Sequence, residues 1–113
     1  MQEPIQNELA SFIANCDWEK IAPHFKEDAA YRVLDWVGCA VAGEHYPQVE
    51  IAQKYFIENG DQGNSTVIGH QTKCSPRTAA FLNGIAGHVC ELDDGHRTAI
   101  GHPGSIAVPT ALA

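Results

Sequence analysis

Residues 75–90 read SPRTAAFLNGIAGHVC, and this stretch decides the fold. Ser75, followed by proline, is a typical helix start, because the hydroxyl caps a free amide and proline fits the first helical position. The residues after it are apolar on almost every side, which indicates a buried helix. Gly84 and Gly87 each cost roughly 1 kcal/mol relative to alanine, so we expect a helix or ligand to approach closely there. Asn83, among apolar neighbours, should need a hydrogen-bond partner.

Further helices are expected around this buried one. Apolar side chains recur at helical spacing in three upstream segments, which are residues 5–15, 23–41 and 47–59. Residues 65–68 are β-branched and short, so they predict one brief extended segment and no sheet. The sequence therefore predicts an all-α protein, a helical bundle of four or five helices.

The last residues of the chain, PTALA at 109–113, resemble a helix that has just begun. They contain no glycine or basic residue of the kind that usually ends a helix. We therefore expect residues 1–113 to be a truncated chain and a partial domain.

Composition excludes several classes of protein. The chain is 44% hydrophobic and 19% charged, which is typical of a globular protein. Seven basic and fourteen acidic residues leave a net charge of −7, which argues against partners such as nucleic acids and anionic membranes. We see no signal peptide and no membrane span, and the four cysteines lack CxxC spacing. Free thiols and a cytoplasmic location are expected.

Residues 88–105, HVCELDDGHRTAIGHPGS, carry most of the chemistry of the chain. They lie between two apolar stretches, and loops on a rigid scaffold often hold functional groups. The charged and titratable residues of this loop are His88, Glu91, Asp93, Asp94, His96, Arg97 and His102.

Three interpretations of this polar loop remain open. Metal binding is possible by residue type, but His88 and Cys90 would point in different directions on a helix, and HExxH spacing is missing, so we expect no metal. General acid–base chemistry is favoured, because neighbouring carboxylates and imidazoles shift each other's pKa values. A rigid Pro-Gly after His102 suits proton transfer. The third interpretation is a solvated loop with capping acids and surface histidines.

The same residues resemble the N-terminal signature of the MmgE/PrpD family. Residues 75–113 show an apolar helix with Asn-Gly, then histidine, an acid pair and His-Pro-Gly before another apolar helix. Upstream, YRVLDWVGCAVAG at 31–43 and TVIG at 66–69 are similar to further family segments. The resemblance covers the chain from about residue 8 to its end, and only the combination of motifs is specific.

The resemblance implies roles at matching positions. Those expected to be catalytic are His102, Glu91, Asp93 and Asp94. His102 matches a proton-transfer histidine, and Glu91 stands where the decarboxylase branch has an active-site aspartate. His96 and Arg97 are expected to bind substrate, with Arg97 as a cation for a carboxylate. Gly95 stands where the family often has threonine, and the spacing from there to His102 is one residue longer than in the decarboxylase. Both departures argue against decarboxylase activity in particular.

Members of this family include 2-methylcitrate dehydratase, cis-aconitate decarboxylase and iminodisuccinate epimerase. The resemblance implies metal-independent proton transfer beside a carboxylate in a small di- or tricarboxylic acid, without a cofactor, as in propionate catabolism. It also implies that residues 1–113 are the N-terminal portion of a mainly helical domain, which in the whole protein is joined by a smaller α/β lid and forms a homodimer. Because the remaining family active-site groups would lie after residue 113, we expect this chain alone to be insufficient for turnover.

A different class of function is an alternative. The fully apolar helix at residues 76–90 and the apolar C-terminal residues would leave core surface uncovered. The chain could then be a catalytically silent helical module that associates with itself or with the rest of an enzyme.

Overall fold

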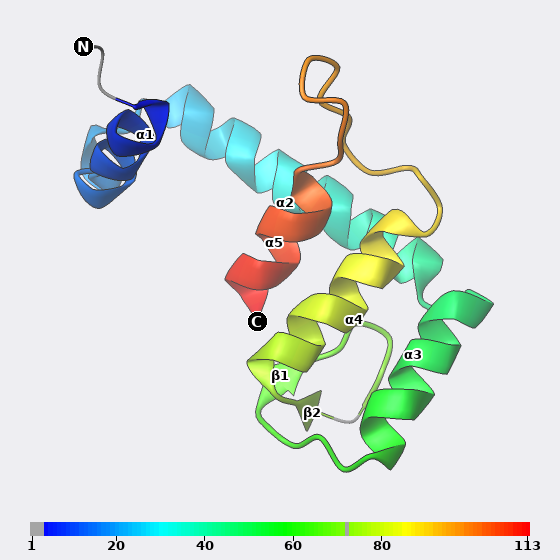
Figure 1. The fold of residues 1–113 in the computed structure, drawn as a ribbon. Coiled ribbons are helices and arrows are strands. Elements are labelled where there is room, and N and C mark those ends of the chain that lie inside the picture. Colours follow the sequence, from blue (N-terminus) through cyan, green and yellow to red (C-terminus); the bar gives the residue numbers. More distant parts are fainter. Residues whose placement is uncertain (1–3, 72) are drawn as a thin grey trace.

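The computed structural model describes residues 4–71 and 73–113, and this part of the chain is mainly helical (Figure 1). The elements, in order, are α1 (Ile5–Ala14), a short 3-10 helix (Trp18–Lys20), α2 (Pro23–Gly43), α3 (Pro47–Glu58), β1 (Ser65–Thr66), β2 (Lys73–Cys74), α4 (Pro76–His88) and α5 (Gly104–Leu112). The predicted all-α class is therefore confirmed, apart from one small two-stranded ribbon. None of the described helices combines the length and apolar character needed to cross a membrane.

Proline sets the start of three of these helices. α2, α3 and α4 each have proline in the first turn, where its missing N–H would have had no partner. At α4 the Ser75 hydroxyl also accepts a hydrogen bond from the Thr78 amide at 3.3 Å. The Asp61 carboxylate in turn accepts hydrogen bonds from the Ser75 amide at 2.9 Å and from its hydroxyl at 3.0 Å. The predicted helix start at residue 75 is confirmed.

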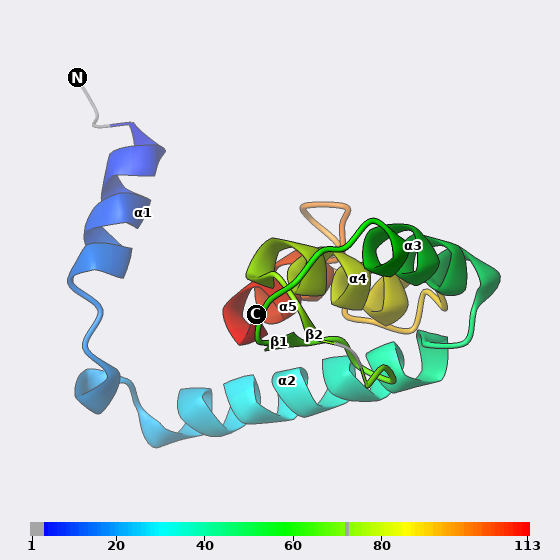
Figure 2. The same ribbon diagram turned by 90° about the horizontal axis from the view of Figure 1, so that it is seen from below.

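Helix α4 lies at the centre of the fold, in contact with α2, α3 and α5 (Figures 1 and 2). Two groups of buried side chains hold these helices together. One group joins α2, α3 and α4 and consists of Trp36, Ala40, Val49 and Ala86. The other connects α4 with the β-ribbon and consists of Val67, Cys74, Ala79 and Leu82.

The two glycines in the middle of α4 allow neighbouring elements to approach closely. A Cβ atom on Gly87 would lie 2.5 to 2.7 Å from three atoms of the Trp36 indole, which is 2% exposed. A Cβ atom on Gly84 would lie 3.1 Å from the backbone carbonyl oxygen of Ser105 in α5. The predicted close approach is therefore real, and the partners are helices α2 and α5.

Asn83 ties α4 to the β-ribbon. Its side-chain oxygen accepts a hydrogen bond from the Ile68 amide at 2.8 Å, and its side-chain nitrogen donates to the Thr66 carbonyl at 2.9 Å. The predicted need for partners is confirmed. The extended segment at residue 65 was also predicted, but its antiparallel partner, Lys73–Cys74, was not.

Helix α1 stands away from the central helices (Figure 2). It contains no buried residue, and its apolar side chains are exposed to solvent. These are Ile5, Leu9, Phe12 and Ile13. The four cysteines are free thiols, as predicted.

Candidate active site

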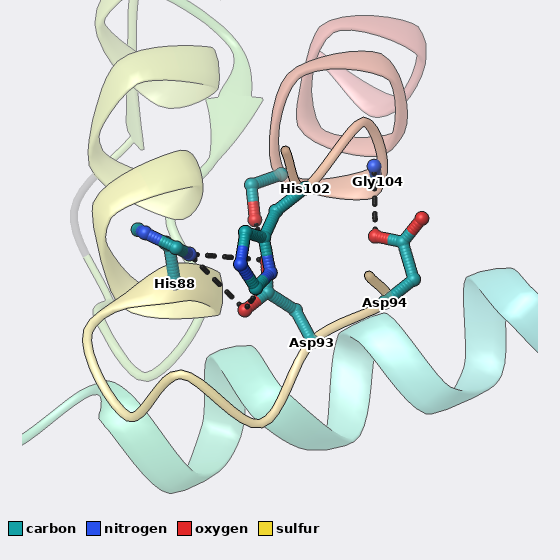
Figure 3. Close-up of polar contacts among 6 residues, drawn as sticks. His88, Asp93, Asp94, His102 and Gly104 are labelled. Carbon is teal, nitrogen blue, oxygen red and sulfur yellow. Dashed lines mark hydrogen bonds and ion pairs between the residues drawn. The ribbon is translucent and has the colours of Figure 1, made fainter. Parts of the chain in front are cut away.

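The buried carboxylate of Asp93 is the centre of the polar loop between α4 and α5 (Figure 3). Its side chain has 0% exposure. The His88 Nδ1 atom lies 3.1 and 3.2 Å from its two oxygens. The Ser105 hydroxyl donates a hydrogen bond to Oδ2. An acid buried this completely needs such partners, because desolvation of an unpaired charge is costly.

His102 contacts the same carboxylate from the other side. Its Nδ1 atom lies 3.3 Å from Asp93 Oδ1, within ion-pair distance. The direction of this contact is not that of a good hydrogen bond, and the nitrogen is buried without another partner among the described residues. The pair is therefore an electrostatic contact, in which Asp93 Oδ1 is the acceptor atom that faces this nitrogen. The rings of His88 and His102 pack edge to face, with centroids 4.7 Å apart.

The fold explains why these residues meet. His88 is the last residue of α4, and His102 and Ser105 lie on either side of the first residue of α5. Gly84 allows the start of α5 to pack against α4, so the two helix ends come together and the loop returns Asp93 between them.

Asp93 is a carboxylate near neutral pH. Burial alone would raise its pKa, but hydrogen bonds from Ser105 and His88, together with the charge of His88, outweigh burial and lower it. An ionised carboxylate is only an acceptor, which suits it to hold N–H and O–H donors.

Asp94 points away from this cluster and supports α5. Its Oδ1 atom accepts a hydrogen bond from the Gly104 amide at 2.9 Å, one of the free amides at the start of the helix. Figure 3 shows that Asp93 and Asp94 face different partners. The contacts of Asp94 are those of a helix-capping residue, and its predicted catalytic role stays a prediction.

Glu91 is exposed at the surface, and its backbone has a positive φ of 50°. The Glu91 amide donates to the His88 carbonyl at 2.8 Å, which closes the end of α4. Its side chain is outside the Asp93 cluster, so the structure does not bring Glu91 together with His102. The predicted role of Glu91 remains untested.

His96 and Arg97 lie in a small turn that is closed by a bridge between His96 and Gly101. The His96 Nδ1 atom accepts a hydrogen bond from the Ala99 amide at 3.0 Å. A cavity of about 430 Å³ opens beside this turn, and its lining includes His96, Arg97 and His102 but no acidic residue of the described part of the chain. The structure thus brings three of the predicted site residues to one cavity.

A metal can also be considered at the Asp93 cluster. One ligand atom each from His88, Asp93 and His102 lies within 4.8 Å of the other two, and two imidazoles with a carboxylate form a common donor set for transition metals. Sequence spacing did not indicate this trio, because the fold creates it. The expected absence of a metal therefore stays a prediction.

Two residues of the cluster had no assigned role in the acid–base interpretation of the sequence. His88 was considered only as a metal ligand, and Ser105 only as the end of the loop. The His88 signal was its place after Asn-Gly at the end of a buried helix. No signal in the sequence identified Ser105, because its contact with Asp93 depends on how α5 packs.

The fold and this cluster define a helical domain that carries two histidines and a buried carboxylate between two helix ends. A model of the MmgE/PrpD N-terminal domain matches residues 7–113, and the chain belongs to this family. It is also 31% identical over 106 residues to a cis-aconitate decarboxylase-like protein of Aspergillus oryzae. That match covers 94% of this chain and 22% of the relative, so the chain spans about a fifth of that protein's length.

Proposed function

We propose that this protein is the N-terminal part of a metal-independent lyase or isomerase that acts on small di- or tricarboxylic acids. One observation supports the proposal above all others. His102, held by a buried carboxylate, lies at the wall of a cavity that also presents His96 and Arg97. Such a site offers a proton-transfer group beside a guanidinium and a further hydrogen-bond donor, which is a combination that suits a polycarboxylate substrate.

Each residue of this cavity has a chemical task in the proposal. Arg97 binds a substrate carboxylate, since a guanidinium matches that group with two parallel hydrogen bonds. His96 adds a second donor, because its Nδ1 atom is engaged by the turn and its Nε2 atom is left for substrate. His102 removes or returns a proton at the carbon next to the carboxylate, a task for which imidazole is well suited near neutral pH.

The acidic residues have different places in the proposal. Asp93 holds His102 in position rather than meeting the substrate, because its carboxylate is fully covered. Asp94 keeps α5 in place through the Gly104 amide. Glu91 is proposed as an acid that reaches a substrate only after the loop closes on it, since it is exposed in this structure.

The proposed substrate is a small di- or tricarboxylic acid, because two observations favour different members of that class. The curated relative is named as cis-aconitate decarboxylase-like, which favours cis-aconitate. Glu91 and Gly95 depart from the decarboxylase pattern, which favours a dehydration such as that of 2-methylcitrate in propionate catabolism. Both acids belong in the test.

The test is calorimetric titration of the protein with cis-aconitate and with 2-methylcitrate. Loss of a hydrogen bond between charged groups costs about 1.5–3 kcal/mol, so Arg97→Gln should weaken binding at least ~10-fold. Arg77→Gln is the matched control, because it removes the same charge from the exposed first turn of α4. Equal affinity of wild type and Arg97→Gln, or no binding of either acid, would overturn the proposal.

A helical module that associates with other chains is a second candidate. The exposed apolar face of α1 favours it, because apolar patches of this kind mark contact surfaces. In this second candidate function, the partner would be a second copy of the chain, which gives a homodimer, or the C-terminal part of the enzyme. Either association would take place in the cytoplasm. Light scattering tests self-association, and a monomer with a cooperative melt would count against it.

A further inference from the structure

We propose that Asp93 is a positioning residue which fixes His88 and His102 in the same tautomer, so that His88 becomes a second acid–base residue beside His102. The proposal deepens the proposed function and rests on it for the identity of the reaction. Its structural half, the shared tautomer, stands on the geometry alone.

The first step is the shared carboxylate. Both imidazoles present Nδ1 to Asp93, at 3.1 Å from His88 and 3.3 Å from His102, and both distances end on the same oxygen. The second oxygen also receives the Ser105 hydroxyl. Figure 3 shows the two rings approaching the carboxylate from α4 and from the start of α5.

The second step is donor and acceptor matching. An ionised carboxylate only accepts hydrogen bonds, and a neutral imidazole has one N–H and one bare nitrogen. Each Nδ1 atom that faces Asp93 must therefore carry the hydrogen, because a bare nitrogen there would be repelled by the oxygen. The partner of one ring nitrogen sets the state of the other, so each Nε2 atom is left bare and able to accept a proton.

The third step is access for His88. Its side chain is 46% exposed and lines a groove of about 530 Å³ between α4 and α5. The groove wall next to it is apolar and includes Phe81, Ile85 and Ile106. The two imidazoles thus share one carboxylate, and His88 lines this groove while His102 lines the cavity beside Arg97.

Two imidazoles at one site suit the proposed chemistry. Dehydration of a hydroxy acid needs a base at the carbon and an acid at the leaving hydroxyl, and epimerisation needs a base that removes the proton from one face of the carbon and an acid that delivers a proton to the other face. One histidine cannot occupy both places at once. His88 supplies the second group, at a ring separation of 4.7 Å from His102.

The test is the tautomer of each histidine in the ¹⁵N-labelled protein, read from long-range proton–nitrogen spectra at mildly alkaline pH. A chelator is present, so that no metal ion holds a ring nitrogen. We expect Nδ1–H for both His88 and His102. His45 is an internal control, because it faces Glu44 through Nε2 at 3.1 Å and should show the opposite tautomer.

Variants separate positioning from general folding. Asp93→Ala should release both rings, so that each moves toward the Nε2–H form that free imidazole favours. Asp94→Asn removes the neighbouring charge but keeps an oxygen for the Gly104 amide, and because Asp94 has no hydrogen bond to either histidine it should leave both tautomers unchanged. If Asp93→Ala does not fold, the wild-type spectrum still decides, since an Nε2–H form of either His88 or His102 overturns the proposal.

Adding cis-aconitate to the labelled protein distinguishes a failure of this inference from a failure of the proposed function. A shift of the His88 and His102 Nε2 resonances supports both roles, whereas a shift of His102 alone overturns the role of His88 as a second acid–base residue. Nδ1–H tautomers without any response to either acid would confirm the positioning by Asp93 and overturn the proposed function, and with it the role of His88.

Discussion

Replacing Gly87 with alanine should destabilise the protein, although alanine is the better helix former. A Cβ atom there would lie 2.5 to 2.7 Å from three atoms of the Trp36 indole. The indole is rigid and only 2% exposed, so it cannot move aside into solvent. Gly38 on α2 is the matched control, because a Cβ atom there meets nothing within 4 Å.

The expected magnitudes follow from two opposing terms. Overpacking of a core costs about 1–3 kcal/mol, and a clash with three buried ring atoms belongs at the upper end. The higher helix propensity of alanine stabilises the helix by about 1 kcal/mol and offsets part of this cost. Gly87→Ala should therefore lower the free energy of unfolding by about 2 kcal/mol. Gly38→Ala has only the favourable term and should raise it by roughly 0.5–1 kcal/mol.

The assay is urea unfolding followed by circular dichroism, with the dependence on denaturant compared between variants. Close packing at Gly87 requires changes of opposite sign and a difference of about 2.5–3 kcal/mol between the two variants. Equal stabilisation by both alanines would refute it, because α2 and α4 would then not be in close contact at Gly87.

Three further predictions concern the supports of α4. Asn83→Ala should cost about 2 kcal/mol in urea unfolding, because it leaves the Ile68 amide and the Thr66 carbonyl without their partner; an unchanged midpoint would contradict the bridging role. Ser75→Ala should cost about 1 kcal/mol in a thermal melt, because the cap of α4 is lost. Several hydrogen bonds, of which the one from the Ser75 backbone amide is the strongest, hold the pKa of the Asp61 carboxylate below its usual value. The contribution of Asp61 to the free energy of unfolding is therefore present above about pH 4 and is lost as the pH falls through the folded-state pKa. Asp61→Asn should make the free energy of unfolding, measured by urea unfolding at several acidic pH values, less dependent on pH.

Local chemistry made much of the helical framework predictable. The start of α4 at Ser75 follows from capping and proline geometry, and the partners of Asn83 follow from the cost of burying an amide. The two glycines of α4 indicated a close approach, but which helices approach depends on packing over long sequence separations. For the same reason β2 was not predicted, since its pairing with β1 is a tertiary contact.

The candidate site was predictable only in its ingredients. The density of acids and histidines identified the loop, yet spacing alone could not tell which acid would be buried. Asp93 is covered and Asp94 supports α5, although they are adjacent, because neighbouring loop residues point to different sides. His88 lies beside His102 only because the end of α4 packs against the start of α5. This is a tertiary contact, so no short-range sequence pattern indicates it.

The central claim is that the loop between α4 and α5 binds a polycarboxylate beside His102. The most direct measurement is a titration of the ¹⁵N-labelled protein with cis-aconitate and 2-methylcitrate, with the trimethyl ester of each acid as an uncharged control. We predict saturable shifts at His96, Arg97 and His102 with the acids and no comparable shifts with the esters. Shifts confined to α3, or equal responses to acid and ester, would contradict the claim.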